Sequence, residues 1–274
     1  MAPDNPLRIA CIGFGEVGQT FARGLLATGG VRFSTYDRLF GQSAGQPIEA
    51  VASTLGVSSC DSAASAILGA DIVISAVTAD AAAEVALHAA EHLGPEQFFF
   101  DINSASPETK RRSALSVNAT GARYIEGAVM APVLKPGIGV PILTGGPYAA
   151  ALSARLNALG MNLTPVAESY GKASAMKLCR SIIIKGLEAL MLDCAAASAH
   201  WQVETEVFAS LGKTFPGIDW RVLSSDMQER VATHGMRRSA EMREAAEMLG
   251  GLSRDTRLIE AVAAAQAQGA RPKP

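Results

Sequence analysis

The sequence predicts an α/β protein: an N-terminal doubly wound Rossmann domain followed by an all-α domain, joined by a long interdomain helix. Segments such as "DIVISAV" and "QFFFDI" lack polar alternation, and helical segments separate them. Strands that are apolar throughout are typical of a parallel sheet covered on both faces, wound by right-handed crossovers. After Ser169 nearly all strand signal is lost, which predicts the helical part. We place the boundary between the ranges 1–166 and 167–274.

The elements follow in order along the first domain. Apolar runs that end in glycine or polar residues predict the strands "LRIACIG", "VRFSTYD", residues 57–59, "DIVISAV", "QFFFDI", "ARYIEGAV" and "VPILTGG". Helical spacing predicts helices over 16–28, 48–55, 61–68, 79–92 and 107–117. Because proline cannot donate to a strand ladder, we expect "VPILTGG" at the edge of the sheet. A long helix over 173–199 and shorter helices to residue 268 complete the chain.

Composition excludes several classes of protein. The chain has 274 residues, 49% of them hydrophobic and 18% charged, which suits a globular protein with two domains. A net charge of −2 indicates no nucleic-acid partner, and apolar stretches broken by charges or glycines indicate no membrane span. The first residues, "MAPDNPLRIACIGFG", do not resemble a secretory signal. Four widely spaced cysteines predict reduced core residues in a cytoplasmic protein: Cys11, Cys60, Cys179 and Cys194.

The segment "GFGEVG" follows a predicted strand and opens a predicted helix. In that setting Gly13 permits a tight turn, Gly15 lets backbone approach a pyrophosphate, and Gly18 lets the helix pack closely on the strand. The helix N-terminus adds N–H donors and a positive dipole end. The predicted cofactor-binding segment also includes Phe14, Glu16 and Val17. The alternative is a glycine-rich turn that binds nothing.

Asp37 closes the second strand, 19 residues after Gly18. A carboxylate there can bind the ribose hydroxyls of NAD and would repel the 2′-phosphate of NADP. Arg38 complicates this prediction, because an arginine could instead pair with that phosphate. We expect NAD, with NADP possible; an ordinary turn that ends a strand is the alternative.

Two more strands end in small or polar residues at the rim where a doubly wound sheet binds ligands. The first rim segment consists of Ala76, Val77 and Thr78, and we expect it to line the cofactor crevice. The next strand ends at Asn103, which we also expect to bind cofactor. Ser104 could contact substrate, although helix capping is an equal alternative for Ser104 and Ser106.

The long helix begins with "YGKASAMKLCRSIIIKG", in which Lys177 precedes an almost wholly apolar run. We therefore expect this helix to be buried between the domains. A buried ammonium is disfavoured by desolvation, so Lys177 could act as general base towards an alcohol and general acid towards a carbonyl. Helical spacing places Arg180 on the same face. The alternative is a structural lysine that reaches water.

Taken together, these segments resemble the β-hydroxyacid dehydrogenase superfamily, which includes 3-hydroxyisobutyrate, tartronate-semialdehyde and 6-phosphogluconate dehydrogenases. Four motifs of that family are matched in order by "GFGEVG", "DINSASP", "EGAVMAP" and "GKASAMKLCR". The resemblance implies hydride transfer between a nicotinamide cofactor and a hydroxy or keto acid, with Lys177 as general acid/base. It also implies a homodimer, and a substrate segment that includes Val129, Met130 and Ala131.

Two departures affect the expected substrate. Where the family has serine–glycine–glycine, this chain has Met130-Ala131-Pro132, which removes a hydroxyl and flexible backbone donors. Where the family has an asparagine after the lysine, this chain has Arg180, which could bind a carboxylate or phosphate. These departures leave open a reductase of bulkier keto or imine substrates. A non-catalytic dinucleotide-binding sensor is the other alternative.

The segment "THGMRRSAEMREAA" resembles a less characterised branch that is 6-phosphogluconate-dehydrogenase-like. His234 and Arg237 could bring positive charge to the substrate pocket, or Arg237 and Glu241 could form a surface ion pair. We expect no metal site, because His88 and His92 have no evident third ligand. The basic run over residues 110–112 is predicted to be a solvated helix face.

Overall fold

The computed structural model describes residues 6–271, so the first five and last three residues of the sequence-based ranges lie outside it. The chain forms two compact units, Met1–Lys177 and Leu178–Pro274. They divide within helix α7 (Lys172–His200), whereas the expected boundary after residue 166 lies near the end of the last strand. Each unit is described by itself.

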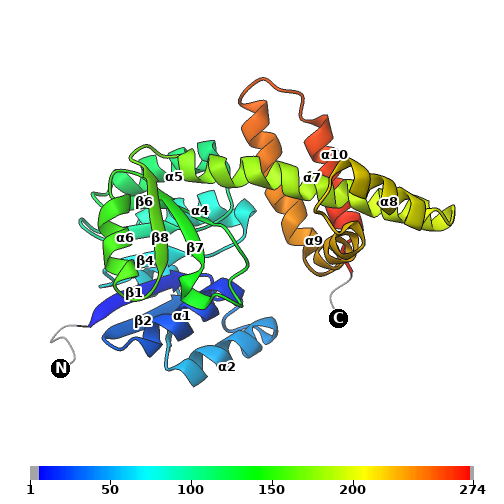
Figure 1. The fold of residues 1–274 in the computed structure, drawn as a ribbon. Coiled ribbons are helices and arrows are strands. Elements are labelled where there is room, and N and C mark those ends of the chain that lie inside the picture. The colour runs from blue at the N-terminus through cyan, green and yellow to red at the C-terminus, as the bar shows by residue number, and fades with distance from the viewer. Residues whose placement is uncertain (1–5, 272–274) are drawn as a thin grey trace. The chain divides into compact units, whose positions relative to one another are not determined.

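The first unit is built on an eight-stranded sheet of order β3-β2-β1-β4-β5-β6-β7-β8 (Figure 1). Neighbouring strands are parallel except for the antiparallel pair β6 and β7. The strands are β1 (Leu7–Ile12), β2 (Val31–Tyr36), β3 (Ser58–Ser59), β4 (Ile72–Ser75), β5 (Phe98–Asp101), β6 (Arg123–Val129), β7 (Pro141–Gly145) and β8 (Asn162–Ala167). The predicted doubly wound fold is confirmed.

Helices cover both faces of this sheet. Helices α1, α2 and α6 pack with one apolar cluster, and α3, α4 and α5 pack with a second. Their bounds are α1 (Glu16–Ala27), α2 (Gln46–Leu55), α3 (Ala63–Ile67), α4 (Ala82–Ala90), α5 (Pro107–Asn118) and α6 (Ala149–Asn157). Short 3₁₀ turns are η1 (Ser43–Gly45), η2 (Ala79–Ala81) and η3 (Gly137–Gly139).

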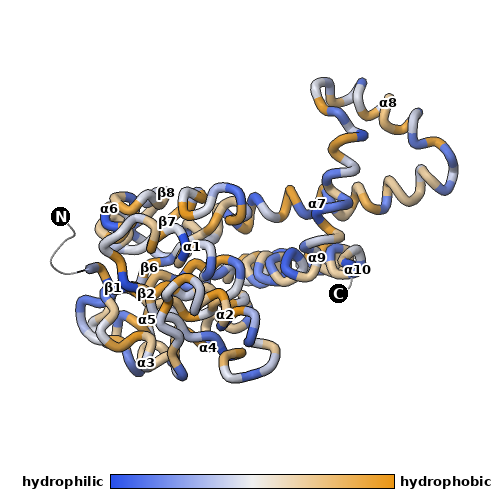
Figure 2. The backbone as a smooth tube through the Cα atoms, turned by 90° about the horizontal axis from the view of Figure 1, so that it is seen from below, coloured by the Kyte–Doolittle hydropathy of each residue, from blue (hydrophilic) through white to orange (hydrophobic). Residues whose placement is uncertain are grey.

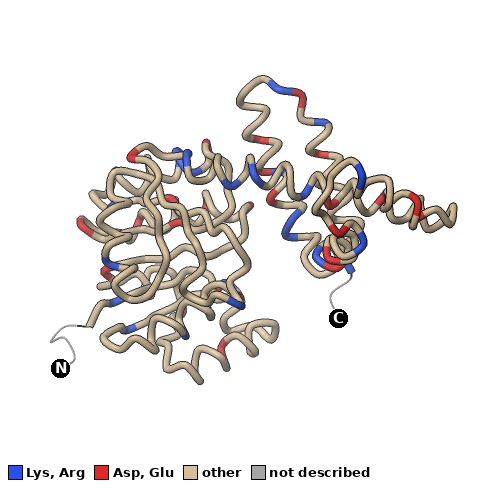
Figure 3. The backbone as a smooth tube through the Cα atoms, viewed as in Figure 1, with Lys and Arg blue, Asp and Glu red and all other residues tan. Residues whose placement is uncertain are grey.

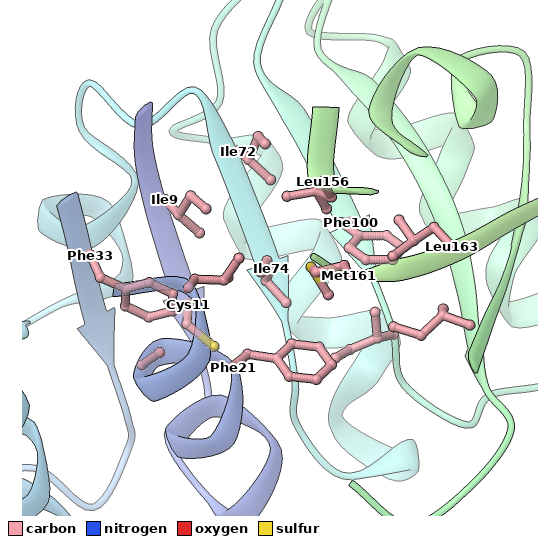
Figure 4. Packing of buried hydrophobic residues seen from close by; sticks show 14 of the residues in the cluster. Ile9, Cys11, Phe21, Phe33, Ile72, Ile74, Phe100, Leu156, Met161 and Leu163 are labelled. Atoms are coloured by element: carbon pink, nitrogen blue, oxygen red, sulfur yellow. The ribbon is translucent and has the colours of Figure 1, made fainter. Parts of the chain in front are cut away.

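The two clusters explain why the strands are apolar at every position. In β1, Ile9 joins the cluster under α1 and Ala10 joins the opposite one. Figure 4 shows the first cluster, where Phe21 of α1 approaches side chains from β1 and β4. Successive side chains of a strand point to opposite faces, so a strand covered on both sides has no solvated position. Burying one large apolar side chain contributes about 1.5–3 kcal/mol.

The expectation for "VPILTGG" was wrong, because β7 lies inside the sheet between β6 and β8. Pro141 is the first residue of β7, where a missing N–H is tolerated. The strand at this edge of the sheet is β8, which contains Pro165. Neither β8 nor α6 was expected from the sequence. β8 is largely exposed, so it lacks the apolar run that marked the other strands.

The second unit consists of the remainder of α7 with α8 (Glu204–Thr214), α9 (Trp220–Gly250) and α10 (Arg257–Gln268). Leu178 and Met242 are fully buried, and they pack in one core cluster with Ile259 of α10. Basic and acidic residues are mixed along α9 (Figure 3). Within residues 6–271, no helix is both long and apolar enough to cross a membrane.

Helix α7 is not buried along its whole length, contrary to the sequence expectation. Hydrophilic positions recur along it (Figure 2), and large apolar side chains such as Ile183 and Leu190 are exposed. Lys185 is buried instead, 3.1 Å from Glu241. Burial lowers the pKa of Lys185, and the Glu241 carboxylate opposes that shift. Cys179, expected in the core, is also exposed.

Candidate functional site at the carboxyl ends of the strands

The glycine-rich turn after β1 has three glycines in different settings. Gly13 has φ +92°, and a Cβ there would lie 2.4 Å from the carbonyl oxygen of Ala76. A Cβ at Gly18 would lie 2.5 Å from the carbonyl oxygen of Gly13, whereas one at Gly15 would meet nothing within 4 Å. The protein's own packing therefore requires Gly13 and Gly18. It does not require Gly15, beside which backbone faces open space.

Helix α1 begins directly after this turn. Gly15 is its N-cap residue and has no side chain to cap the helix. Glu16 and Val17 form the first turn, and Glu16 is exposed. An open helix N-terminus beside a glycine with free space is suited to bind an anionic group such as a pyrophosphate.

Asp37 lies at the end of β2 and supports this turn. One carboxylate oxygen accepts the N–H of Phe14 at 2.8 Å, and the other accepts the N–H of Leu39 at 3.0 Å. Phe14 itself is fully buried. The carboxylate is only half-buried, so it both orders the glycine-rich turn and faces the rim beside it.

Arg38 follows β2 and Thr78 follows β4, at the carboxyl ends of these strands. Both affect Asp80, whose pKa is lowered mainly by a hydrogen bond from the Thr78 side chain and to a lesser degree by the charge of Arg38. Arg38 itself is exposed.

Asn103 ties the ends of β4 and β5 together. Its Oδ1 accepts the N–H of Val77 at 2.7 Å, and its Nδ2 donates to Ser75 at 2.9 Å and to Asp101 at 2.8 Å. The residue is 4% exposed. Its side chain thus holds the backbone of the Val77 segment in place at the rim.

Lys177 is the residue of the long helix that reaches this rim. Its Nζ donates to Ser104 Oγ at 2.5 Å, and the lysine is half-buried. Ser106, by contrast, caps α5 by accepting the N–H of Thr109 at 3.1 Å. The two alternatives for these serines are thereby separated: Ser106 is the helix cap, and Ser104 contacts Lys177.

A buried charge network that the sequence did not reveal lies beneath Asn103. Asp101 and Lys110 are both fully buried, with 2.8 Å between Nζ and Oδ1. The hydroxyl of Tyr124 donates to Asp101 Oδ2 at 2.7 Å. The expectation of a solvated face was therefore wrong for Lys110, although Arg111 is exposed. Position within a basic run could not reveal this, because Lys110 turns towards the strand that ends at Asp101.

Glu126 of β6 is a second functional candidate that sequence reasoning missed. The carboxylate is fully buried and accepts the N–H groups of Gly171 at 2.9 Å and Ala173 at 2.8 Å. It also accepts the hydroxyl of Ser174 at 3.1 Å. Glu126 therefore anchors the start of the helix that carries Lys177. An acid inside an otherwise buried strand was the available signal.

The other predicted substrate residues lie in two places. Val129 ends β6, Met130 donates its N–H to the carbonyl of Pro141 at 2.9 Å, and Ala131 is exposed. Arg180, His234 and Arg237 belong to the second unit, where Arg180 and Arg237 are exposed. No cluster of metal-ligating side chains occurs in the described part of the chain.

The fold and the rim define a dinucleotide-binding α/β protein. Residues 8–165 match the family described as the NAD binding domain of 6-phosphogluconate dehydrogenase, and residues 197–268 match a domain of unknown function. The first match covers more than half of the chain, so the protein belongs to this family and to the β-hydroxyacid dehydrogenase superfamily. The resemblance inferred from the four motifs is confirmed.

Solved structures agree with this membership. A conserved hypothetical protein from Sinorhizobium meliloti is 38% identical, with a TM-score of 0.78 over 97% of this chain and 89% of its own. A conserved protein of unknown function, described as structurally similar to 3-hydroxyacid dehydrogenases, is 31% identical. The match has a TM-score of 0.73 and covers 96% of this chain and 99% of the other. The 3-hydroxyisobutyrate dehydrogenase of Mycobacterium tuberculosis shares the fold at 15% identity, with a TM-score of 0.77. This match covers 96% of this chain and 93% of the other.

Proposed function

We propose that this protein is an NAD(P)-dependent dehydrogenase of a hydroxy acid, with Lys177 as general acid/base. The observation that carries the proposal is the hydrogen bond between Lys177 Nζ and Ser104 Oγ, at the end of β5. This bond holds an amine at the rim, because Ser104 directly follows Asn103 in the chain. Asn103 in turn accepts the backbone N–H of Val77. A proton acceptor held beside a dinucleotide crevice suits the oxidation of an alcohol.

The residues around the rim fit a nicotinamide dinucleotide. The start of α1 and the open space at Gly15 would hold its pyrophosphate, and the Asp37 carboxylate would bind its ribose. The nicotinamide end of the cofactor would be lined by Ala76, Val77 and Thr78, whose backbone is held by Asn103. When bound, this cofactor supplies the hydride acceptor or donor.

Lys177 moves the proton that accompanies the hydride. In its neutral form it accepts the hydroxyl proton of the alcohol, and in its charged form it returns a proton to the carbonyl oxygen. Ser104 Oγ limits the positions open to Nζ, so the amine is held in one orientation before substrate arrives.

We propose NAD as the preferred cofactor. The Asp37 carboxylate at the end of β2 would repel a 2′-phosphate, and each of its oxygens already accepts a backbone N–H that holds it there. Arg38 is exposed nearby and is the group that could favour NADP instead.

We propose that Arg180 binds the acidic group of the substrate, and that His234 and Arg237 add positive charge. Arg180→Ala should then raise KM for an acidic substrate; an unchanged KM for every acid tested would remove this role. We also propose a cytoplasmic homodimer, on the basis of the reduced cysteines and the family resemblance of the helical part.

One observation favours a second candidate function. Met130-Ala131-Pro132 replaces the small, flexible substrate loop of the family, and Ala131 and Pro132 are exposed. A bulkier keto or imine substrate would be compatible with this segment.

The test is absorbance at 340 nm with NAD and NADP separately, over short and aromatic 3-hydroxy acids and a set of imines, beside Lys177→Ala. We expect turnover that falls by about a thousandfold or more in the variant, with dinucleotide affinity retained. Wild-type turnover in Lys177→Ala would reject the lysine role. Dinucleotide binding without lysine-dependent turnover would favour a sensor.

A further inference from the structure

Glu126 is an acid in an unusual setting for a strand residue. Its carboxylate is fully buried. A buried carboxylate is costly unless hydrogen bonds compensate for the lost water. All three donors come from residues 171–174, at the start of α7. The strand is thus joined to one turn of one helix.

Two acceptor oxygens are needed for this arrangement. Oε1 accepts the N–H of Ala173, while Oε2 accepts the N–H of Gly171 and the hydroxyl of Ser174. The first N–H groups of a helix have no partner within the helix, and a negative charge there also interacts favourably with the helix dipole. A carboxylate satisfies both requirements, whereas a neutral amide of the same shape supplies only one acceptor oxygen.

Neighbouring glycines make room for this contact. Gly145 is opposite Glu126 on β7, and a Cβ there would lie 2.4 Å from Glu126 Oε1. Gly171 has φ +97°, which turns the chain sharply into α7. A side chain at position 145 would therefore displace the carboxylate, and a side chain at position 171 would strain the backbone at the start of the helix.

The turn anchored by Glu126 is the turn that precedes Lys177. Ala173 is four residues before Lys177, so the two lie on the same face of the helix, one turn apart. Ser104, the partner of Lys177, follows the strand that ends at Asp101, and Asp101 is the register neighbour of Glu126. Adjacent strands thus hold the two sides of the Lys177–Ser104 contact.

We propose that Glu126 is the positioning residue for Lys177: by binding the first turn of α7, its carboxylate sets where the Lys177 amine lies relative to Ser104. This inference rests on the proposed function for its catalytic consequence. Glu126 does not touch the reacting atoms and acts only through the helix.

The test compares Glu126→Gln with Asp71→Asn. The first variant keeps the volume and removes one acceptor oxygen, so one N–H of the helix start loses its partner. The second makes the same chemical change at a carboxylate that accepts the N–H of Arg8 before β4, at the opposite ends of the strands. Circular dichroism establishes that each variant is folded.

The first readout does not require a known substrate. Competitive acetylation with acetic anhydride, followed by mass spectrometry, gives the reactivity of Lys177 relative to exposed Lys213 of α8 in the same molecule. We expect Glu126→Gln to change this ratio by about threefold or more and Asp71→Asn to leave it unchanged. A wild-type ratio in folded Glu126→Gln would overturn the proposal. If Glu126→Gln does not fold, Ser174→Ala replaces it, because it removes one of the three donors to Glu126. We then expect the ratio in Ser174→Ala to differ from wild type, and a wild-type ratio in that folded variant would overturn the proposal.

The second readout is turnover on any substrate that shows Lys177-dependent activity. We expect Glu126→Gln to lower kcat by about tenfold or more, with dinucleotide Kd and substrate KM within about twofold of wild type. An equal kcat, or an effect confined to KM, would contradict positioning. If the wild type shows no Lys177-dependent turnover, the proposed function fails, while the acetylation ratio still decides whether Glu126 positions Lys177.

Discussion

Asp101 of β5 and Glu126 of β6 are directly paired in neighbouring parallel strands, and both are fully buried. Asp101 accepts the N–H and Nδ2 of Asn103, which orders the segment that leads to Ser104. Glu126 accepts N–H groups at the start of the helix that carries Lys177. A pair of acids at one level of the sheet therefore supports both sides of the candidate site.

Substitutions of Gly13 and Gly15 should separate an effect on folding from an effect on cofactor binding. Gly13→Ala places a Cβ 2.4 Å from a carbonyl oxygen at a positive φ, and we expect it to destabilise the protein by about 2–3 kcal/mol. Gly15→Ala meets no protein atom within 4 Å, so it should unfold like the wild type but bind dinucleotide about tenfold more weakly. Urea unfolding and calorimetric titration measure the two effects. Wild-type dinucleotide affinity in Gly15→Ala would contradict a pyrophosphate at that turn.

Adjacent basic residues of α5 should differ sharply in their effect on stability. Lys110→Met leaves Asp101 buried without its cation, which should cost about 3–5 kcal/mol. Arg111→Met changes an exposed side chain and should lie within about 0.5 kcal/mol of wild type. Urea unfolding of both variants checks the difference. Similar small losses in both would mean that the buried pair contributes little.

Asp37 should control the choice between the two cofactors. Asp37→Ser removes the charge that would repel a 2′-phosphate and leaves a hydroxyl beside Arg38. We expect the affinity ratio of NADP to NAD to rise by about tenfold or more, which is about 1.4 kcal/mol. Fluorescence titration of each dinucleotide measures the ratio. An unchanged ratio would place the ribose elsewhere.

Tyr124 should contribute a pH-dependent part of the stability. Burial, followed by the nearby Asp101 charge, raises the pKa of its phenol well above 10.0. The unfolded state then loses this proton first, so the contribution is fully present below about pH 10 and is lost as the pH rises above it.

The variant Tyr124→Phe lacks this titration and also the hydrogen bond to Asp101. We expect it to be less stable than wild type by about 1–2 kcal/mol at neutral pH, with the difference shrinking above about pH 10. Urea unfolding across that range gives the difference directly. A constant difference at all pH values would show that the phenol titrates alike in both states.

Much of the fold followed from local patterns. The strands around Ile9 and Phe99 are apolar at successive positions, and this pattern required cover on both faces before any contact was known. It failed for β8, since that strand is largely exposed and contains Pro165. Because β8 was not predicted, β7 was expected at the edge of the sheet, whereas it lies between β6 and β8.

The residues of the candidate site also differ in whether the sequence could identify them. The glycine-rich turn, Asp37 and Lys177 could be recognised from the sequence, because their spacing along the chain reflects local backbone geometry. Asp101, Lys110 and Glu126 could not, because the burial of a charge depends on which distant segment packs against it. The sequence alone predicts that Lys110 belongs to a solvated basic run, and only the structure shows that it is buried beside Asp101.

The sequence by itself determined the doubly wound fold, the glycine-rich turn after the first strand and the lysine at the head of the long helix, since each depends on residues close together in the chain. Only the tertiary structure decided that Lys177 bonds to Ser104 and that Glu126 anchors the turn before it. Those contacts join residues 73 and 47 positions apart, and strand order and register bring them together.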